Sequence, residues 1–195
     1  MNETVEQLQI FLSRYMEIDE RLASLLVETA MVRRYGKDEF LLRQGDLSEE
    51  TFFILKGCVR SFSLVSGEDK TLDFYCEEEP IMPLELGEKR PASHSLIAME
   101  ELILIASTPS MEEEAFKRHP EIKNVCLAMA ETMSHSLQKK FTFYRTSSAE
   151  DRYIALREQR PDLLQRVPQY HIASYLGIKP ESLSRIRRRL QSQNR

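Results

Sequence analysis

The stretch from Pro168 to Leu190 restricts the local fold more than any other part of the sequence. Its apolar residues fall at helical spacing in two groups, which are Ile172, Ala173 and Leu176, then Leu183, Ile186 and Leu190. Gly177 closes the first group, and glycine adopts the left-handed backbone of a tight turn without a steric penalty. Pro180 follows, and its fixed backbone angle suits the first position of a helix. The pattern predicts a helix-turn-helix from Gln169 to Leu190.

The second predicted helix carries a basic outward face. With its apolar residues turned inward, Glu181, Ser182 and Arg185 point outward near its start, as in helices that enter the major groove of DNA. Arginine matches the paired acceptors of guanine, glutamate accepts from cytosine, and arginines further along suit phosphates. The residues expected at DNA are Gln169, Lys179, Pro180, Glu181, Ser182, Arg185, Arg188 and Arg189. A surface helix with a solvated basic face is the alternative interpretation.

Charge is divided unevenly along the chain. From Glu150 onward ten basic residues stand against five acidic ones, a net charge of +5, whereas the rest of the chain carries −9 and the whole chain −4. A basic unit attracts a polyanion, and the acidic remainder repels it. This division favours a DNA-binding unit over a ligand-sensing or interaction module without DNA binding, which is the main alternative function.

Between Met31 and Ser107 the sequence is typical of a sheet. Short β-prone runs alternate with turn signals such as Gly45-Asp46 and Lys56-Gly57. The expected strands are 40–42, 51–55, 58–64, 71–75 and 102–105. Strands at this spacing predict an antiparallel sandwich or jelly roll. One or two short helices are expected before them, within Val5 to Ala30.

A long helix is predicted after the strands, from Glu121 to Tyr144. Apolar residues recur there every three or four positions along about six turns. A helix of that length needs a partner for its apolar face, so we expect it to join two copies of the chain. The residues assigned to this interface are Val125, Met129, Met133 and Leu137. A core helix packed on the β-domain is the alternative.

A new helix is expected directly after the long one. Ser147 and Glu150 fit the S-x-x-E capping box, and the helix that they open should run to about Gln159. We place a domain boundary there, which gives three parts: 1–110, 111–146 and 147–195.

Cysteine and histidine usage argues against metal chemistry. The three cysteines are odd in number and widely spaced, and the four histidines form no ligand spacing, so we expect no metal and no cofactor. A metal-dependent oxygenase built on a jelly roll needs two histidines and a carboxylate, and only His94 lies in the β-region. We therefore expect no enzyme. The N-terminus lacks signal-peptide features and no apolar run would span a bilayer, so a cytoplasmic protein without membrane contact is predicted.

The whole chain resembles the Crp/Fnr family of bacterial transcription regulators. Residues 166–178, Arg-Val-Pro-Gln-Tyr-His-Ile-Ala-Ser-Tyr-Leu-Gly-Ile, are similar to one subgroup, and 38–46 with 52–60 are similar to the opening of the family's cyclic-nucleotide-binding β-roll. Gly45 and Gly57 stand where that fold turns between strands. The family's recognition helix reads bases through R-E-x-x-x-R. Glu181 and Arg185 match its second and last members, and Pro180 replaces the first.

The resemblance implies an α+β fold with an N-terminal antiparallel β-roll, a long central dimerisation helix and a C-terminal winged-type helix-turn-helix domain. Only five residues follow Leu190, so no hairpin wing is expected after the recognition helix. The implied partners are double-stranded DNA, a second copy of the chain as homodimer, RNA polymerase and an unknown small-molecule effector. The implied function is sequence-specific regulation of transcription.

The effector is expected to differ from cyclic AMP. Family members that bind cyclic nucleotides hold the phosphate with an Arg-Ser pair, and here Pro91 and Ala92 stand in its place. Five acidic residues lie in the same region, Glu77, Glu78, Glu79, Glu85 and Glu88, and they would repel a phosphate. The residues assigned to the effector pocket are Arg60, Tyr75, Glu85, Arg90 and His94.

Overall fold

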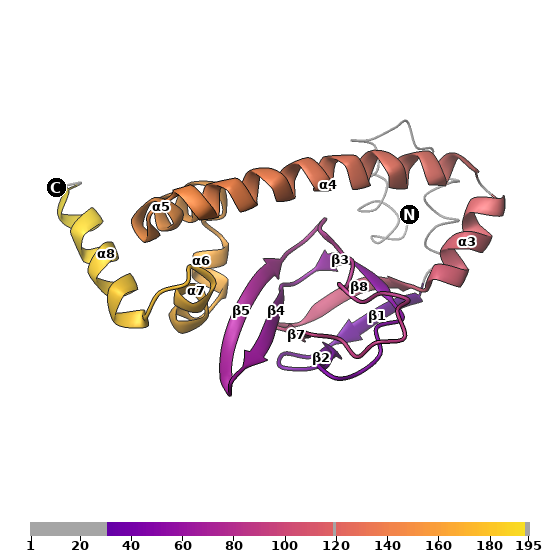
Figure 1. The fold of residues 1–195 in the computed structure, drawn as a ribbon, viewed down its shortest axis with the longest axis horizontal. Helices are drawn as coiled ribbons and strands as arrows, with labels where there is room; N and C mark the ends of the chain where they lie inside the picture. The colour runs from indigo at the N-terminus through magenta and orange to yellow at the C-terminus, as the bar shows by residue number, and fades with distance from the viewer. Residues whose placement is uncertain (1–30, 119, 194–195) are drawn as a thin grey trace. The chain divides into compact units, whose positions relative to one another are not determined.

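The computed structural model describes residues 31–118 and 120–193, so the helices expected between Val5 and Ala30 lie outside the described residues. In the described part, two four-stranded sheets come first in the chain and helices α3 to α8 follow (Figure 1).

The first sheet has the strand order β1-β8-β3-β6. Its strands are β1 (Met31–Tyr35), β8 (Leu102–Ser107), β3 (Thr51–Lys56) and β6 (Pro80–Ile81). The central strand β8 pairs antiparallel with both neighbours, and its Leu104 lies opposite Arg33 of β1 and Ile54 of β3. β3 in turn pairs antiparallel with β6. The antiparallel arrangement predicted from the sequence is confirmed.

The second sheet has the order β2-β7-β4-β5. Its strands are β2 (Phe40–Leu42), β7 (Ser95–Ala98), β4 (Val59–Val65) and β5 (Glu68–Tyr75), and β5 is an edge strand of this sheet. Ser66 and Gly67 join β4 to β5 with φ of 53° and 82°. Positive φ at both central residues is typical of the two-residue turn that matches the twist of a hairpin.

The core lies between the two sheets because alternate residues of each strand point inward. Its members come from both sheets and are Leu42, Phe52, Ile54, Val59, Ile81, Ala92, Leu96, Ala98, Leu102, Leu104 and Ala106. Gly57 lies beside this core at φ 105°, and a Cβ at that position would meet the carbonyl oxygen of Glu101 at 2.6 Å. Gly45 also has positive φ, 101°, so both glycines turn the chain as predicted.

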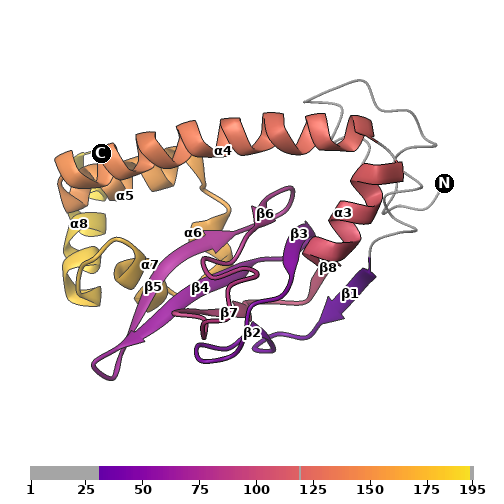
Figure 2. The same cartoon turned by 45° about the vertical axis from the view of Figure 1, so that its right-hand side comes forward.

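The described helices begin with α3 (Pro109–Arg118), which follows β8 directly. The carboxylate of Glu112 on α3 accepts hydrogen bonds from the hydroxyls of Thr51 and Ser107, at 2.6 and 2.7 Å. These bonds tie the start of α3 to the ends of β3 and β8, and Figure 2 shows the helix beside them. The long helix is α4 (Pro120–Thr146), close to the predicted 121–144.

The C-terminal helices are α5 (Ala149–Gln159), α6 (Leu163–Arg166), α7 (Gln169–Tyr175) and α8 (Pro180–Gln193), and no strand follows α8 in the described residues. The capping box of α5 lies one residue later than predicted. Ser148, not Ser147, is the N-cap; its hydroxyl accepts from the amide of Asp151, whose carboxylate accepts from the Ser148 amide at 3.0 Å. The shorter aspartate side chain fills the role that the sequence motif gives to Glu150.

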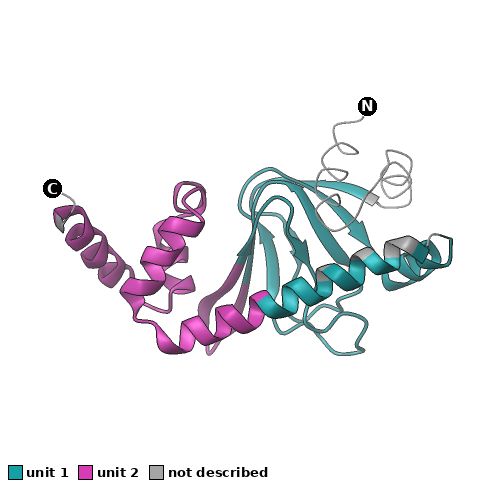
Figure 3. Cartoon of the chain, turned by 90° about the horizontal axis from the view of Figure 1, so that it is seen from above, with its two compact units in different colours: residues 1–61, 74–135 teal, residues 62–73, 136–195 magenta. Residues whose placement is uncertain are grey.

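The chain forms two compact units. One comprises 1–61 and 74–135, and the other comprises 62–73 and 136–195. Figure 3 colours the ends of β4 and β5 with the C-terminal helices, because the hairpin between them belongs to the second unit.

Candidate nucleic-acid interface

The turn between α7 and α8 has the geometry that Gly177 and Pro180 predict. Gly177 has φ 70°, and the amide of Ile178 donates to the carbonyl of Ala173 at 3.0 Å. Pro180 opens α8, and the carbonyl of Lys179 accepts from the amides of Ser182 and Leu183 at 2.9 and 3.2 Å. The turn thus closes α7 and starts α8 within four residues.

The inner faces of these helices form a small core with α5 and α6. Its buried members are Tyr153, Leu156, Leu163, Val167, Ile172, Ala173, Leu176 and Leu183. Ile186 and Leu190, which were also predicted to face inward, are half-buried. Because Ala173 has no side chain beyond Cβ, α8 can approach α7 closely there.

The residues expected at DNA lie mostly on the outside of this core. Gln169, Lys179, Pro180, Glu181, Arg185, Arg188 and Arg189 are exposed, and Ser182 is half-buried. The guanidinium of Arg185 donates to the hydroxyl of Ser182 at 3.3 Å, one helical turn away. Arg189 forms an ion pair with Glu150 of α5, whereas Arg188 has no ion pair or hydrogen bond to the described residues. The exposed face of α8 therefore holds one arginine fixed to α5 and two that can meet a ligand.

The predicted effector residues lie at different depths in the β-roll. Arg60 on β4 and His94 before β7 are buried, and Tyr75 on β5 packs against the core. Arg90 is exposed and forms an ion pair with Glu88, two residues before it. Arg90 therefore does not extend into the core of the roll.

Glu85 and His94 are brought together inside the roll. Their Oε2 and Nδ1 atoms lie 3.7 Å apart, and both side chains are nearly buried. Burial lowers the pKa of His94, and a hydrogen bond from Ser93 lowers the pKa of Glu85, which favours neutral imidazole beside an ionised carboxylate. Among the described residues, Glu85 Oε2, His94 Nδ1 and the Ser48 hydroxyl are buried without a hydrogen bond.

Pro91 and Ala92 replace the family's phosphate-binding pair, and both take part in backbone contacts with the chain around Leu47. Pro91 forms a bridge with Leu47, and the Ala92 amide donates to the carbonyl of Asp46 at 2.7 Å. Ala92 itself is buried in the core. Its side chain offers no group that could neutralise a phosphate.

Sequence reasoning missed contacts that link distant parts of the chain. Ser174 of α7 bonds to the backbone of β5, and no local pattern marks either partner. It also missed the exposed apolar residue Leu127 of α4, which a strict 3.5-residue spacing with Leu137 would have found.

Membrane-spanning helices and metal-binding clusters were searched for in the described residues. In the described ranges, no helix combines the length and apolarity needed to cross a bilayer. Across 31–118 and 120–193, no three histidine, cysteine, aspartate or glutamate side chains converge closely enough to hold a metal ion.

The comparisons with known proteins agree with this architecture. Residues 32–118 match the family model of the cyclic nucleotide-binding domain. No curated protein matches the chain.

Several solved structures share the fold. The c-di-GMP-responsive global regulator CLP of Xanthomonas campestris has a TM-score of 0.70 at 18% identity, with 90% of this chain and 93% of that one covered. A CooA mutant from Carboxydothermus hydrogenoformans has a TM-score of 0.67 at 14% identity, covering 96% and 84%. FixK2 from Bradyrhizobium japonicum has a TM-score of 0.65 at 18% identity, covering 85% and 86%. Residues 32–118 therefore match the cyclic nucleotide-binding domain, and the chain has the fold of Crp/Fnr-type regulators.

Proposed function

We propose that the chain is a sequence-specific DNA-binding regulator of transcription that works as a homodimer. The observation that carries this proposal is the exposed face of α8, where Glu181, Arg185 and Arg188 stand beyond a fully formed helix-turn-helix core. The matching family and fold are those of regulatory proteins rather than enzymes. The proteins with similar folds include a global regulator, which supports the same role.

Direct binding to DNA tests the proposal. Selection from a random pool of duplexes should return a preferred site, and Arg185→Ala should lose about 1 to 3 kcal/mol on that site and relax its sequence preference. Arg188→Ala is the matched control: it should weaken all duplexes alike and lower the salt slope by about one unit. Equal loss of Arg185→Ala on selected and random DNA would contradict base reading by that residue.

The homodimer is proposed to form along α4. Leu127, Leu137 and Phe141 are 55%, 60% and 64% exposed, and the small residues Ala130 and Ser134 between them are exposed as well. Positions 127, 130, 134, 137 and 141 alternate by three and four residues, which is the spacing of a coiled-coil seam. We call these five residues the α4 seam.

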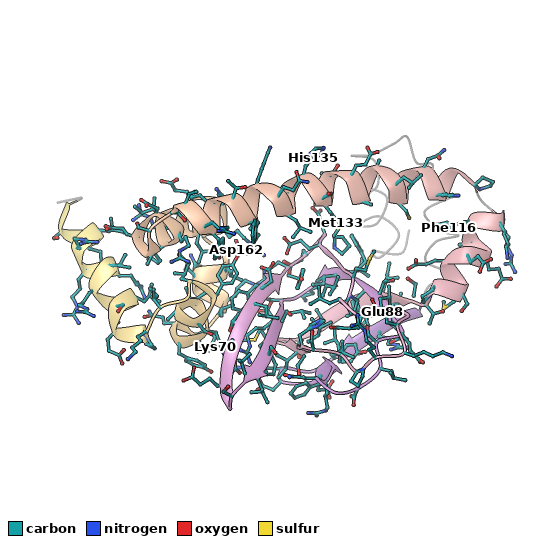
Figure 4. The ribbon with its side chains drawn as sticks, in the orientation of Figure 1. Lys70, Glu88, Phe116, Met133, His135 and Asp162 are labelled. Atoms are coloured by element: carbon teal, nitrogen blue, oxygen red, sulfur yellow. The ribbon has the colours of Figure 1, made fainter. Side chains whose placement is uncertain are left out.

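The α4 seam shares Leu137 with the interface predicted from the sequence. Met133 is half-buried and lies about a quarter turn away from the seam on the helix. Figure 4 places Met133 and His135 on opposite sides of α4. The other two predicted interface residues, Val125 and Met129, have side chains that fall outside the described part of the structure.

The β-roll is proposed to sense an effector other than cyclic AMP. Three observations support this. Pro91 forms a β-bridge with Leu47 and Ala92 donates its amide to Asp46, so neither offers a side chain to a phosphate. Arg90 forms an exposed ion pair with Glu88, and the ionised Glu85 lies beside His94. A phosphate in this place would meet a carboxylate instead of the paired cation that anions require.

A further inference from the structure

The β4–β5 hairpin is bonded to the first helix of the helix-turn-helix. The hydroxyl of Ser174 on α7 accepts from the amide of Thr71 on β5 at 2.9 Å and donates to the carbonyl of Asp69 at 3.4 Å. Both partners are backbone groups of an edge strand, which otherwise present unpaired donors and acceptors. One serine hydroxyl thus forms hydrogen bonds with both the Thr71 amide and the Asp69 carbonyl of that edge strand.

Further contacts in the same unit join the hairpin to α4, and α4 to α7. Lys140 of α4 forms an ion pair with Asp73 of β5 at 2.5 Å, and its ammonium lies 5.5 Å from the ring centre of Tyr175. The rings of Tyr144 and Tyr175 meet edge to face with centroids 5.9 Å apart. Residue 71 is buried although its neighbours 70 and 72 are exposed. The hairpin is therefore held by the Ser174 hydrogen bonds to α7 and by the Lys140–Asp73 ion pair to α4, and the ring contact joins these two helices.

The turn of the hairpin brings acidic residues close to the helix-turn-helix, because the Asp69 carbonyl bonds Ser174 of α7. Glu68 and Asp69 are exposed, and Lys70 forms an ion pair with Glu68. The pKa of Glu68 is lowered first by that hydrogen bond and the charge of Lys70, and also by the positive charge of Lys179. Lys179 lies directly before α8 and is one of the residues expected at DNA. A carboxylate in this position competes with phosphate for the lysine and repels the DNA backbone.

We propose that the docked hairpin is an autoinhibitory contact, in which Ser174 latches β5 to α7 and so holds the acidic residues Glu68 and Asp69 beside the helix-turn-helix. DNA binding then requires release of the latch, and the apparent affinity for DNA is reduced by the fraction of molecules that are docked. This inference rests on the proposed DNA-binding function. It assigns to the hairpin a role that is separate from effector binding.

Hydrogen exchange first tests the latch without DNA. In the full-length protein, Ser174→Ala should accelerate exchange of the Thr71 amide, whereas Ser192→Ala should not, because the Ser192 hydroxyl donates to Arg189 of its own helix. Unchanged exchange at Thr71 in Ser174→Ala would show that the latch is absent in solution and would overturn the inference alone.

Binding to a random 30-base-pair duplex at low salt then tests inhibition. Ser174→Ala should bind roughly two- to tenfold more tightly than wild type, the range expected from one lost hydrogen bond. Thr71→Pro removes the amide donor from an edge strand, where proline is tolerated, and should give a similar gain. Adding Ser174→Ala to Thr71→Pro should then give no further gain.

The acidic turn is tested by a charge-matched pair. Glu68→Gln should tighten duplex binding, and Glu88→Gln should not, although each glutamate pairs with a basic residue two positions later. Weaker or unchanged binding by Ser174→Ala and Thr71→Pro would overturn autoinhibition while leaving DNA binding intact. Failure of wild type and both release variants to bind any duplex would overturn the proposed function as well.

Discussion

Two glycines with left-handed backbones differ in what surrounds them. Gly57 has φ 105°, and its added Cβ would meet backbone atoms at 2.6 Å, whereas Gly67 has φ 82° with nothing within 4 Å. Gly67→Ala should therefore cost about 1 to 2 kcal/mol of unfolding free energy, the penalty of the backbone conformation alone. Gly57→Ala should cost clearly more, because the backbone of Glu101 must also move. Denaturant unfolding of both variants measures the difference, and equal losses would contradict the close approach at Gly57.

Asp151 makes the stability of the helix-turn-helix unit depend on pH. Hydrogen bonds from the Ser148 hydroxyl and amide lower the pKa of its carboxyl below the ordinary value of 3.8. A folded-state pKa that is lowered contributes stability above the unfolded value, and this contribution disappears as the pH falls through and below about 4. Wild type should thus be more stable than Asp151→Asn at pH 6, and the gap should shrink toward pH 3. Guanidinium unfolding at both pH values checks this; a gap that grows in acid would contradict it.

At the scale of elements, the loop from β6 to β7 determines what the β-roll can bind. Calorimetric titration with millimolar cyclic AMP should show no saturable heat, because Ala92 is buried and the nearby Glu85 is ionised. Saturable binding at micromolar cyclic AMP would contradict the proposed selectivity. In that case Arg90→Ala would reveal whether Arg90 leaves Glu88 to hold the phosphate.

Elements with local signals could be predicted from the sequence. Gly177 and Pro180 marked the turn, since both residue types act on their own backbone, and the apolar spacing of α4 predicted its length within two residues at each end. The five predicted strands are present, but β1, β6 and β7 were missed. β1 carries two arginines, β6 has two residues beginning with proline, and β7 is four residues long, so none shows a clear alternating pattern.

In the candidate site, too, features with a local sequence signal could be predicted, and contacts between distant residues could not. The basic face of α8 follows from helical spacing, and Glu85 and His94, both predicted for the effector pocket, lie 3.7 Å apart. The bond between Thr71 and Ser174 joins residues 103 positions apart, and only the tertiary fold brings them together. The assignments of these residues to DNA or an effector stay predictions.

At the scale of the whole molecule, dimerisation decides whether two recognition helices can act together. Leu137→Glu places a charge on the α4 seam and should give a monomer with operator affinity near the nonspecific level. Burial of Leu127, Leu137 and Phe141 against a second copy should stabilise the dimer by roughly 1.5 to 3 kcal/mol for each side chain. Sedimentation and titration with the selected site measure both effects.

His135→Glu is the control for this experiment, because His135 is exposed on another side of α4 from the seam. It should leave the dimer intact. A dimeric Leu137→Glu variant with unchanged affinity would place the subunit contact elsewhere. For the intact dimer, the specific DNA site is expected to contain two half-sites spaced by one DNA turn, roughly 34 Å.

The hairpin at residues 62–73 has a consequence for any attempt to divide the protein. By its contacts this hairpin belongs with 136–195, although most of the β-roll lies on either side of it in the sequence. A fragment that starts at Ser136 would leave Lys140 without Asp73 and Ser174 without Thr71. A chimera that grafts these helices onto another sensor should therefore carry the hairpin with them, so that donor and recipient exchange a discontinuous module rather than a tail.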